Sequence, residues 1–164
     1  MLDTHDPVAR GVGASSGVAC GRAAFDSAAA EQLTGCGDPV ILVRPDTNTG
    51  DVAGFAVSAG IVTAVGGRTA HAALVARQMG KPCVVGCDRT VVDIARRRAQ
   101  FATAAVAEGE WISIDGDSGD VYLGRREVVT ERPEDELAEV ERWRQSATPD
   151  SRGTRLDAVR LSLP

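Results

Sequence analysis

Short apolar runs, each ended by a glycine, proline or acidic turn, form the dominant pattern of the chain as far as residue 125. Runs of this kind are typical of strands, since a half-buried or fully buried strand needs only four to eight residues. We predict strands at residues 17–25, 39–43, 60–65, 83–85, 111–115 and 120–124. The last two alternate on either side of Gly116-Asp117-Ser118-Gly119, which predicts a β-hairpin.

Three segments between the strands have helical signals instead. Asp26 and Ser27 precede a run that predicts a short helix to Leu33, and residues 46–49 supply capping side chains for another at 50–55. Residues 69–79 predict the clearest helix, with Thr69 as its N-cap and Gly80 as the residue that ends it. Residues 91–106 fit a loose helix or a strand equally well. Strands that alternate with helices predict an α/β fold.

Both ends of the chain differ from this pattern. Residues 1–10 are polar and irregular, and we expect a flexible tail followed by a domain at residues 11–125. Residues 126–164 predict a linker that contains one amphipathic helix, with Leu137, Val140 and Trp143 spaced three apart. We therefore expect a helical arm at the C-terminal side of the domain.

Composition narrows the possible functions. The chain has 164 residues, of which 43% are hydrophobic and only 4% aromatic, so one domain with a core of small aliphatic side chains is expected. A net charge of -5 argues against a nucleic-acid or anionic-membrane surface. No apolar stretch reaches the roughly 20 residues that cross a bilayer, and the N-terminus lacks the features of a signal peptide, which together predict a cytoplasmic protein.

Metal binding is not predicted. Cys83 and Cys87 are spaced C-x3-C, but no second close cysteine pair completes a four-ligand zinc site, so we expect free thiols. Asp115, Asp117 and Asp120 lie at a turn and do not match the positions of a calcium-binding loop.

The candidate chemistry lies at residues 66–77. If Thr69 caps the helix, His71 falls on the first turn, where unpaired N–H groups and the helix dipole favour an anion and keep the imidazole neutral for attack at phosphorus. Thr69, Arg68 and Arg77 are candidate partners of a phosphoryl group, and Gly66 and Gly67 allow another protein to approach closely. The spacing alone leaves open an ordinary surface or capping role for His71.

The segment Gly66-Gly67-Arg68-Thr69-Ala70-His71-Ala72-Ala73-Leu74-Val75-Ala76-Arg77, followed by Gly80-Lys81-Pro82-Cys83-Val84-Val85-Gly86, resembles the phosphohistidine signature of the mobile domain of PEP-utilising enzymes, especially pyruvate phosphate dikinase. The resemblance covers roughly residues 10 to 125. It implies a three-layer β/β/α domain in which His71 carries a phosphoryl group while the domain swivels between two active sites.

The resemblance also implies partners. An ATP-grasp nucleotide-binding domain and a PEP/pyruvate barrel, supplied in trans or by a parent enzyme, would exchange the phosphoryl group with His71, with Mg²⁺ beside ATP or PEP on those partners and no cofactor bound by this chain. We expect no turnover by the chain alone. Thr69 matches a family threonine beside the phosphohistidine that is a regulatory phosphorylation target in some members.

Two positions depart from the family pattern: Ala70 stands where serine is usual, and Ser16 stands where proline is common. The alternative to a phosphoryl carrier is therefore a degenerate domain of the same fold that acts as a binding or regulatory module without phosphorylation of His71.

Overall fold

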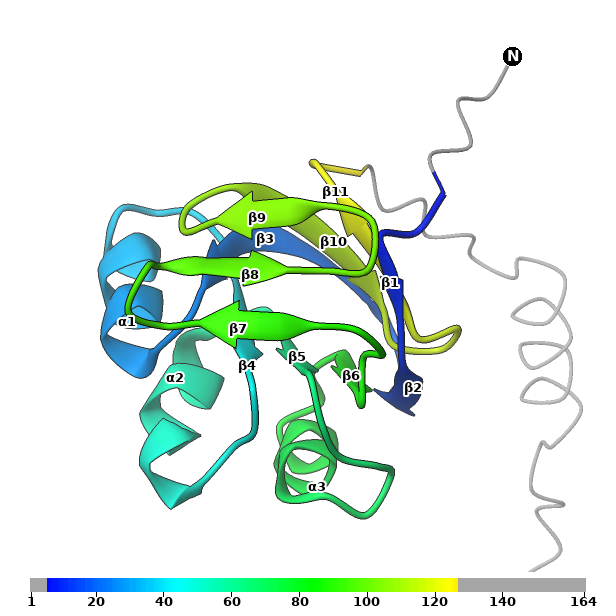
Figure 1. The fold of residues 1–164 in the computed structure, drawn as a ribbon. Helices are drawn as coiled ribbons and strands as arrows, with labels where there is room; N and C mark the ends of the chain where they lie inside the picture. The colour runs from blue at the N-terminus through cyan, green and yellow to red at the C-terminus, as the bar shows by residue number, and fades with distance from the viewer. Residues whose placement is uncertain (1–5, 127–164) are drawn as a thin grey trace, which may run out of the picture. The chain divides into compact units, whose positions relative to one another are not determined.

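The strands of the chain form two sheets in the computed structural model, which describes residues 6–126 (Figure 1). The strands are β1 (Ala9–Arg10), β2 (Val12–Ser15), β3 (Val18–Ala24), β4 (Val40–Arg44), β5 (Gly60–Thr63), β6 (Cys83–Val85), β7 (Val91–Asp93), β8 (Arg98–Gln100), β9 (Ala105–Ala107), β10 (Trp111–Asp115) and β11 (Asp120–Leu123). The helices are α1 (Ser27–Gly35), α2 (Val52–Val57), α3 (His71–Gln78) and a 3-10 turn, η1 (Thr49–Asp51). The predicted mixed α/β class is confirmed.

The larger sheet has the strand order β1-β11-β10-β3-β4-β5-β6-β2. Its centre, β3 to β6, is parallel, and α1 and α3 lie in the connections β3 to β4 and β5 to β6, as parallel pairing requires. The hairpin β10–β11 joins antiparallel to β3, with Ile114 opposite both Val121 and Ala19. On the other edge, β2 runs antiparallel to β6.

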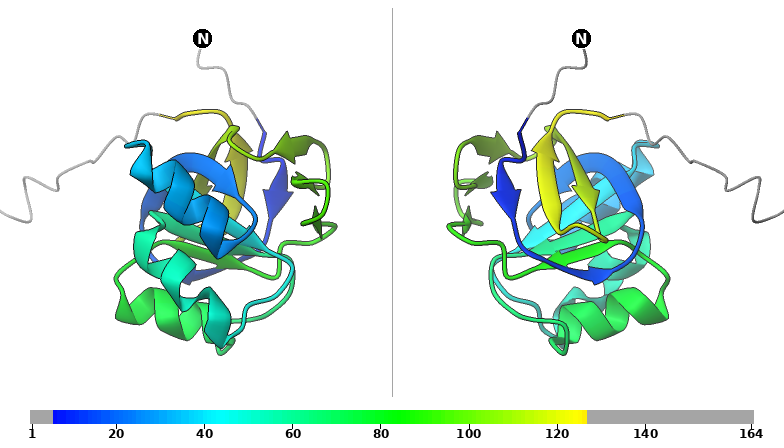
Figure 2. Two further views of the ribbon diagram at one scale, coloured as in Figure 1. Left: turned by 90° about the vertical axis from the view of Figure 1, so that its left-hand side faces the viewer. Right: turned by 90° about the vertical axis from the view of Figure 1, so that its right-hand side faces the viewer.

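The central strands are buried on both faces, which explains their unbroken apolar runs. In β4, Val40 and Leu42 pack with the helices, whereas Ile41 and Val43 pack against the smaller sheet. The helices thus cover one face of the larger sheet and the smaller sheet covers the other (Figure 2). Burial of each such aliphatic side chain contributes roughly 1.5–3 kcal/mol.

The smaller sheet settles the segment that the sequence left open. Residues 91–107 form the antiparallel strands β7, β8 and β9, with Ala99 paired to Val106. Ala99 and Phe101 lie two residues apart and both enter the core against the larger sheet, so the strand period prevails over the loose helical spacing.

Capping side chains determine where the first helices begin, as predicted. The Asp26 carboxylate accepts the N–H of Ala29 at 2.7 Å at the start of α1. Asn48 and Asp51 form a capping box at the start of η1, and Asp51 is buried beside Arg44, with Nε and Oδ1 3.1 Å apart. These caps connect the ends of β3 and β4 to the helices that follow them.

Ordered structure begins before Gly11, which corrects the expected tail at residues 1–10. Ala9 and Arg10 form β1 against β11, and Val8 is buried. A two-residue strand is too short to give a periodic signal; it is held by the Arg10 guanidinium, whose Nε donates to Asp120 at 2.6 Å. The amphipathic helix predicted around Trp143 lies outside the described residues.

Candidate functional site

His71 is the first residue of α3 and is exposed to solvent. Ala70 is the N-cap, with φ −63° and ψ 156°, and its carbonyl accepts the first helical hydrogen bond from Leu74 at 3.1 Å. Alanine has no side-chain acceptor, so the N–H groups of the first turn are left without a capping oxygen. An exposed imidazole thus lies beside N–H donors that an incoming anion can use.

The expected cap at Thr69 is wrong. A tight turn, closed by the N–H of Ala70 on the carbonyl of Gly67 at 2.9 Å, places Thr69 before the helix begins. The Thr69 side chain is exposed, and within residues 6–126 its hydroxyl makes no hydrogen bond. It is therefore available to a ligand, and its contact with a phosphoryl group stays a prediction.

Phe55 of α2 is the neighbour that contacts the imidazole. Its ring is fully buried and meets the His71 ring edge to face, with centroids 6.5 Å apart and an interplanar angle of 65°. Aromatic pairs favour this arrangement because the positive edge of one ring meets the negative face of the other. The spacing of residues along the chain gave no signal for this contact, since it depends on how α2 packs beside α3.

Lys81 holds the end of α2 in place. Its ammonium donates to the carbonyls of Phe55, Ala56 and Ser58 at 2.7, 2.5 and 2.6 Å. Burial lowers the pKa of Lys81, while the three carbonyls are partners for its cationic form. Lys81 therefore fixes the backbone that carries Phe55, a role that its position just after Gly80 did not suggest.

The loop before His71 requires glycine at position 66 but has room for a side chain at position 67. Gly66 has φ +114°, and a Cβ there would lie 3.1 Å from the Cβ of Ala70. Gly67 has no heavy atom within 4 Å of the place where a Cβ would stand. The free domain thus has no steric need for glycine at 67, whereas Gly66 is required by its backbone conformation.

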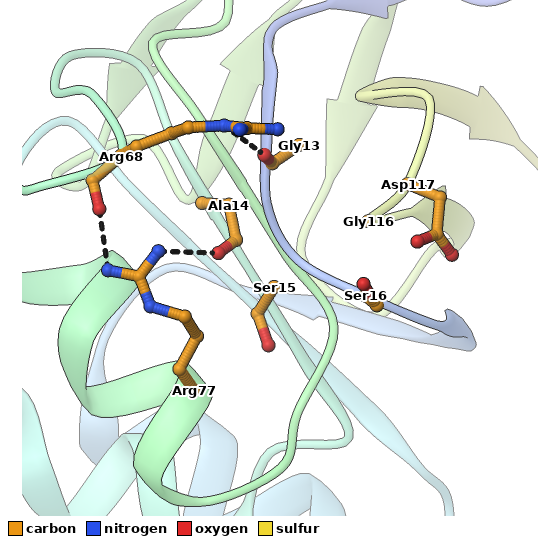
Figure 3. A pocket seen from close by; sticks show the side chains of 8 residues that line it. All are labelled: Gly13, Ala14, Ser15, Ser16, Arg68, Arg77, Gly116 and Asp117. Carbon is orange, nitrogen blue, oxygen red and sulfur yellow. Dashed lines mark hydrogen bonds between the residues drawn. The ribbon is translucent and has the colours of Figure 1, made fainter.

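Arg77 connects this loop to the edge of the larger sheet (Figure 3). One of its terminal nitrogens donates to the carbonyl of Arg68 at 2.6 Å and the other to that of Ala14 at 3.1 Å. Ala14 lies at a register shift of β2, where it has no partner in the ladder. Arg77 therefore acts on the backbone of the loop; a contact of its guanidinium with a phosphoryl group stays a prediction.

Arg68 lies against β2. Its Nε donates to the carbonyl of Gly13 at 3.3 Å, and its side chain lines a cavity of about 280 Å³ together with Arg77 and residues 13–16 and 116–117 (Figure 3). His71 is not part of the lining. The structure thus brings Arg68 and Arg77 together, on the β2 side of the loop, and leaves Phe55 as the side chain beside His71.

The cysteines offer no second reactive group near the loop. Burial raises the pKa of both Cys83 and Cys87 to about 12, and for Cys83 the neighbouring Cys87 adds to the effect. Thiols with such pKa values are poor nucleophiles at neutral pH. No cluster of three His, Cys, Asp or Glu side chains suited to a metal ion is found among residues 6–126.

Comparison with known proteins identifies the family. Residues 36–119, just over half of the chain, match the family model of the mobile domain of PEP-utilising enzymes. The chain is 45% identical to pyruvate, phosphate dikinase of Entamoeba histolytica over 129 residues and 42% identical to pyruvate, phosphate dikinase 1 of Arabidopsis thaliana over 132 residues. The chain belongs to this family.

These matches cover 78% and 76% of the chain, respectively, and the chain spans about 14% of the length of either dikinase. Among solved structures, a solution structure of Enzyme I (nEIt) protein is similar, with 27% identity and a TM-score of 0.39 over 65% of this chain and 38% of that one.

The residues matched by the family model include the candidate site of this mobile domain. The segment that carries His71 lies within the matched residues, as do Phe55 and Lys81, which brace it. The helices of residues 6–126 include none long and apolar enough to cross a membrane.

Proposed function

We propose that this mobile domain is a phosphoryl carrier in which His71 is the acceptor. In the forward step the lone pair of an imidazole nitrogen attacks phosphorus, a nitrogen–phosphorus bond forms, and the oxygen that leaves the donor keeps the electron pair of the broken bond. Transfer to the acceptor is the same reaction in reverse. One observation carries the proposal: an exposed imidazole begins a helix whose first-turn N–H groups have no side-chain cap.

Three further features support the assignment. The first-turn N–H groups and the positive end of α3 stabilise the charge of a phosphoryl group attached at His71. The hydroxyl of Thr69, two residues away, makes no hydrogen bond within residues 6–126, and Gly67 leaves room for a partner's backbone to approach.

The partners follow from the family and not from contacts of this chain. We propose an ATP-grasp domain that charges His71 and a PEP/pyruvate barrel that exchanges the group, with the three-layer domain swivelling between them. Mg²⁺ would accompany ATP or PEP on those partners, as the family implies.

The test is to incubate the full chain with a pyruvate, phosphate dikinase whose own phosphohistidine is replaced by alanine, together with labelled PEP or ATP. A carrier gains label that is stable in alkali and labile in acid. His71→Ala must abolish it, and His5→Ala, which removes the other histidine of the chain, must not. Absence of label with both donors, while unsubstituted dikinase gains label in a parallel reaction, would favour the degenerate binding module.

A further inference from the structure

The cavity between β2, the loop before α3 and the β10–β11 turn has an unusual charge arrangement. In residues 6–126, carboxylates lie within ion-pair distance of Arg10, Arg22, Arg44, Arg89, Arg96 and Arg97. Arg68 and Arg77 line the same cavity, and within the described part of the chain neither has such a carboxylate. Two guanidinium groups thus line one cavity without an ion-pair partner among residues 6–126, in a chain whose net charge is -5.

The hydrogen bonds of these arginines leave donors free. Arg68 uses only its Nε, on the carbonyl of Gly13, and among residues 6–126 its two terminal nitrogens have no partner. Ser15 lines the cavity and, within the same residues, its hydroxyl is likewise unbonded. A guanidinium fork is the donor arrangement that carboxylate and phosphate oxygens prefer.

Asp117, which also lines the cavity, is the one carboxylate that would oppose an anion there. Its Oδ2 accepts the N–H of Gly17 at 3.0 Å, and hydrogen bonds from Gly17 and the Ser16 hydroxyl lower its pKa. Its charge is therefore already stabilised on its own side of the cavity, and it makes no ion pair with Arg68 or Arg77 within 4.0 Å.

The walls of the cavity are held by close backbone packing. A Cβ on Gly13 would lie 2.4 Å from the carbonyl oxygen of Gly116, and one on Gly116 would lie 1.9 Å from that of Ser15. Arg77 fixes the third wall by binding the carbonyls of Arg68 and Ala14. A site held this way needs little rearrangement to accept a small ligand.

We infer that this cavity is a binding site for a small oxyanion, a phosphate or carboxylate group, held by the terminal nitrogens of Arg68 in the field of Arg77. The site is separate from the proposed phosphoryl acceptor, because His71 lies outside the lining. Occupancy neutralises the positive charge of the two arginines that line the cavity.

The experiment is an NMR titration of the full chain with inorganic phosphate, and with acetate at matched ionic strength. We expect saturable shifts of the amides at residues 13–16 and 68, which Arg68→Gln weakens by about tenfold or more, since one charged hydrogen-bond partner is lost. Arg98→Gln, which removes the same charge from an exposed position on β8, leaves the affinity unchanged. Asp117→Asn strengthens binding, because it removes the opposing charge.

The two anions distinguish the source of the ligand. Saturation by phosphate alone indicates a tetrahedral phosphate, whereas saturation by both anions indicates that a carboxylate, such as an acidic side chain of a partner, also fits. Shifts that never saturate, or that are confined to residues 71–73 and survive Arg68→Gln, would overturn the inference. His71→Ala must retain anion binding. The outcome therefore does not depend on whether His71 is the phosphoryl acceptor.

Discussion

Substitution of Ala70 by serine tests where α3 begins and what its first turn lacks. Ala70 already has the extended conformation of an N-cap, so a serine there can accept a first-turn N–H without any backbone change. Serine in place of alanine at an N-cap contributes about 1 kcal/mol to the free energy of unfolding. Thr69 lies before the helix, and we expect Thr69→Ala to change that free energy by less than about 0.5 kcal/mol.

Urea unfolding of the full chain, followed by circular dichroism, measures both effects. With a slope of roughly 1–3 kcal/mol per molar urea, Ala70→Ser raises the midpoint by about 0.3–1 M, and Thr69→Ala leaves it nearly unchanged. The reverse result, a loss of about 1 kcal/mol in Thr69→Ala with no gain in Ala70→Ser, would show that threonine is the cap and that our account of the site is wrong.

Two other predictions concern the loop and the sheet edge. Gly86 has φ +61°, and a Cβ there would lie 2.5 Å from the carbonyl oxygen of Gly66. Gly86→Ala should therefore lower the free energy of unfolding by about 1–3 kcal/mol, whereas Gly67→Ala should leave it nearly unchanged. Equal losses for the two variants in urea unfolding would refute this geometry. At Asp120, burial opposes ionisation, but hydrogen bonds from Arg10 and Ser118 and the charge of Arg10 lower the pKa overall. Ionised Asp120 therefore stabilises the fold at pH values above its unfolded pKa of about 3.9, and this stabilisation is lost as the pH falls through the lower folded pKa. Asp120→Asn should thus be less stable than the parent at pH 7 and should approach the stability of the parent near pH 3. An equal difference in the urea midpoint at both pH values would contradict this.

Hydrophobic periodicity predicted most of the larger sheet because its central strands are buried on both faces. Residues 40–43 and 83–85 are uninterrupted apolar runs whose side chains are all buried, so they are visible without knowledge of their partners. The smaller sheet was ambiguous because its strands are only three residues long and contribute few core side chains. Strand β1 was missed for the same reason.

The candidate site was predicted in outline and not in its contacts. The glycine pair and the alanine-rich run indicated a helix with a histidine near its start, but intrinsic capping preference favoured threonine, and the turn from Gly67 to Ala70 moves the start to His71. Arg77 was a candidate partner of a phosphoryl group, and its position in the sequence did not indicate that its guanidinium binds two carbonyls on the β2 side. Such choices depend on long-range packing, which residue spacing does not encode.

The contacts around α3 bear on where specificity resides. Arg77 and Lys81 are both bound to backbone carbonyls, and the ring of Phe55 meets the imidazole edge to face. Within residues 6–126 the described side chains therefore orient His71 without a hydrogen bond to it. A carrier that meets two different active sites gains from this arrangement, because a carboxylate bonded to the imidazole would favour its protonated form and oppose transfer. The groups that select donor and acceptor should then lie on the partners, and exchange of Arg68 should alter docking more than the chemical lability of the phosphoryl group.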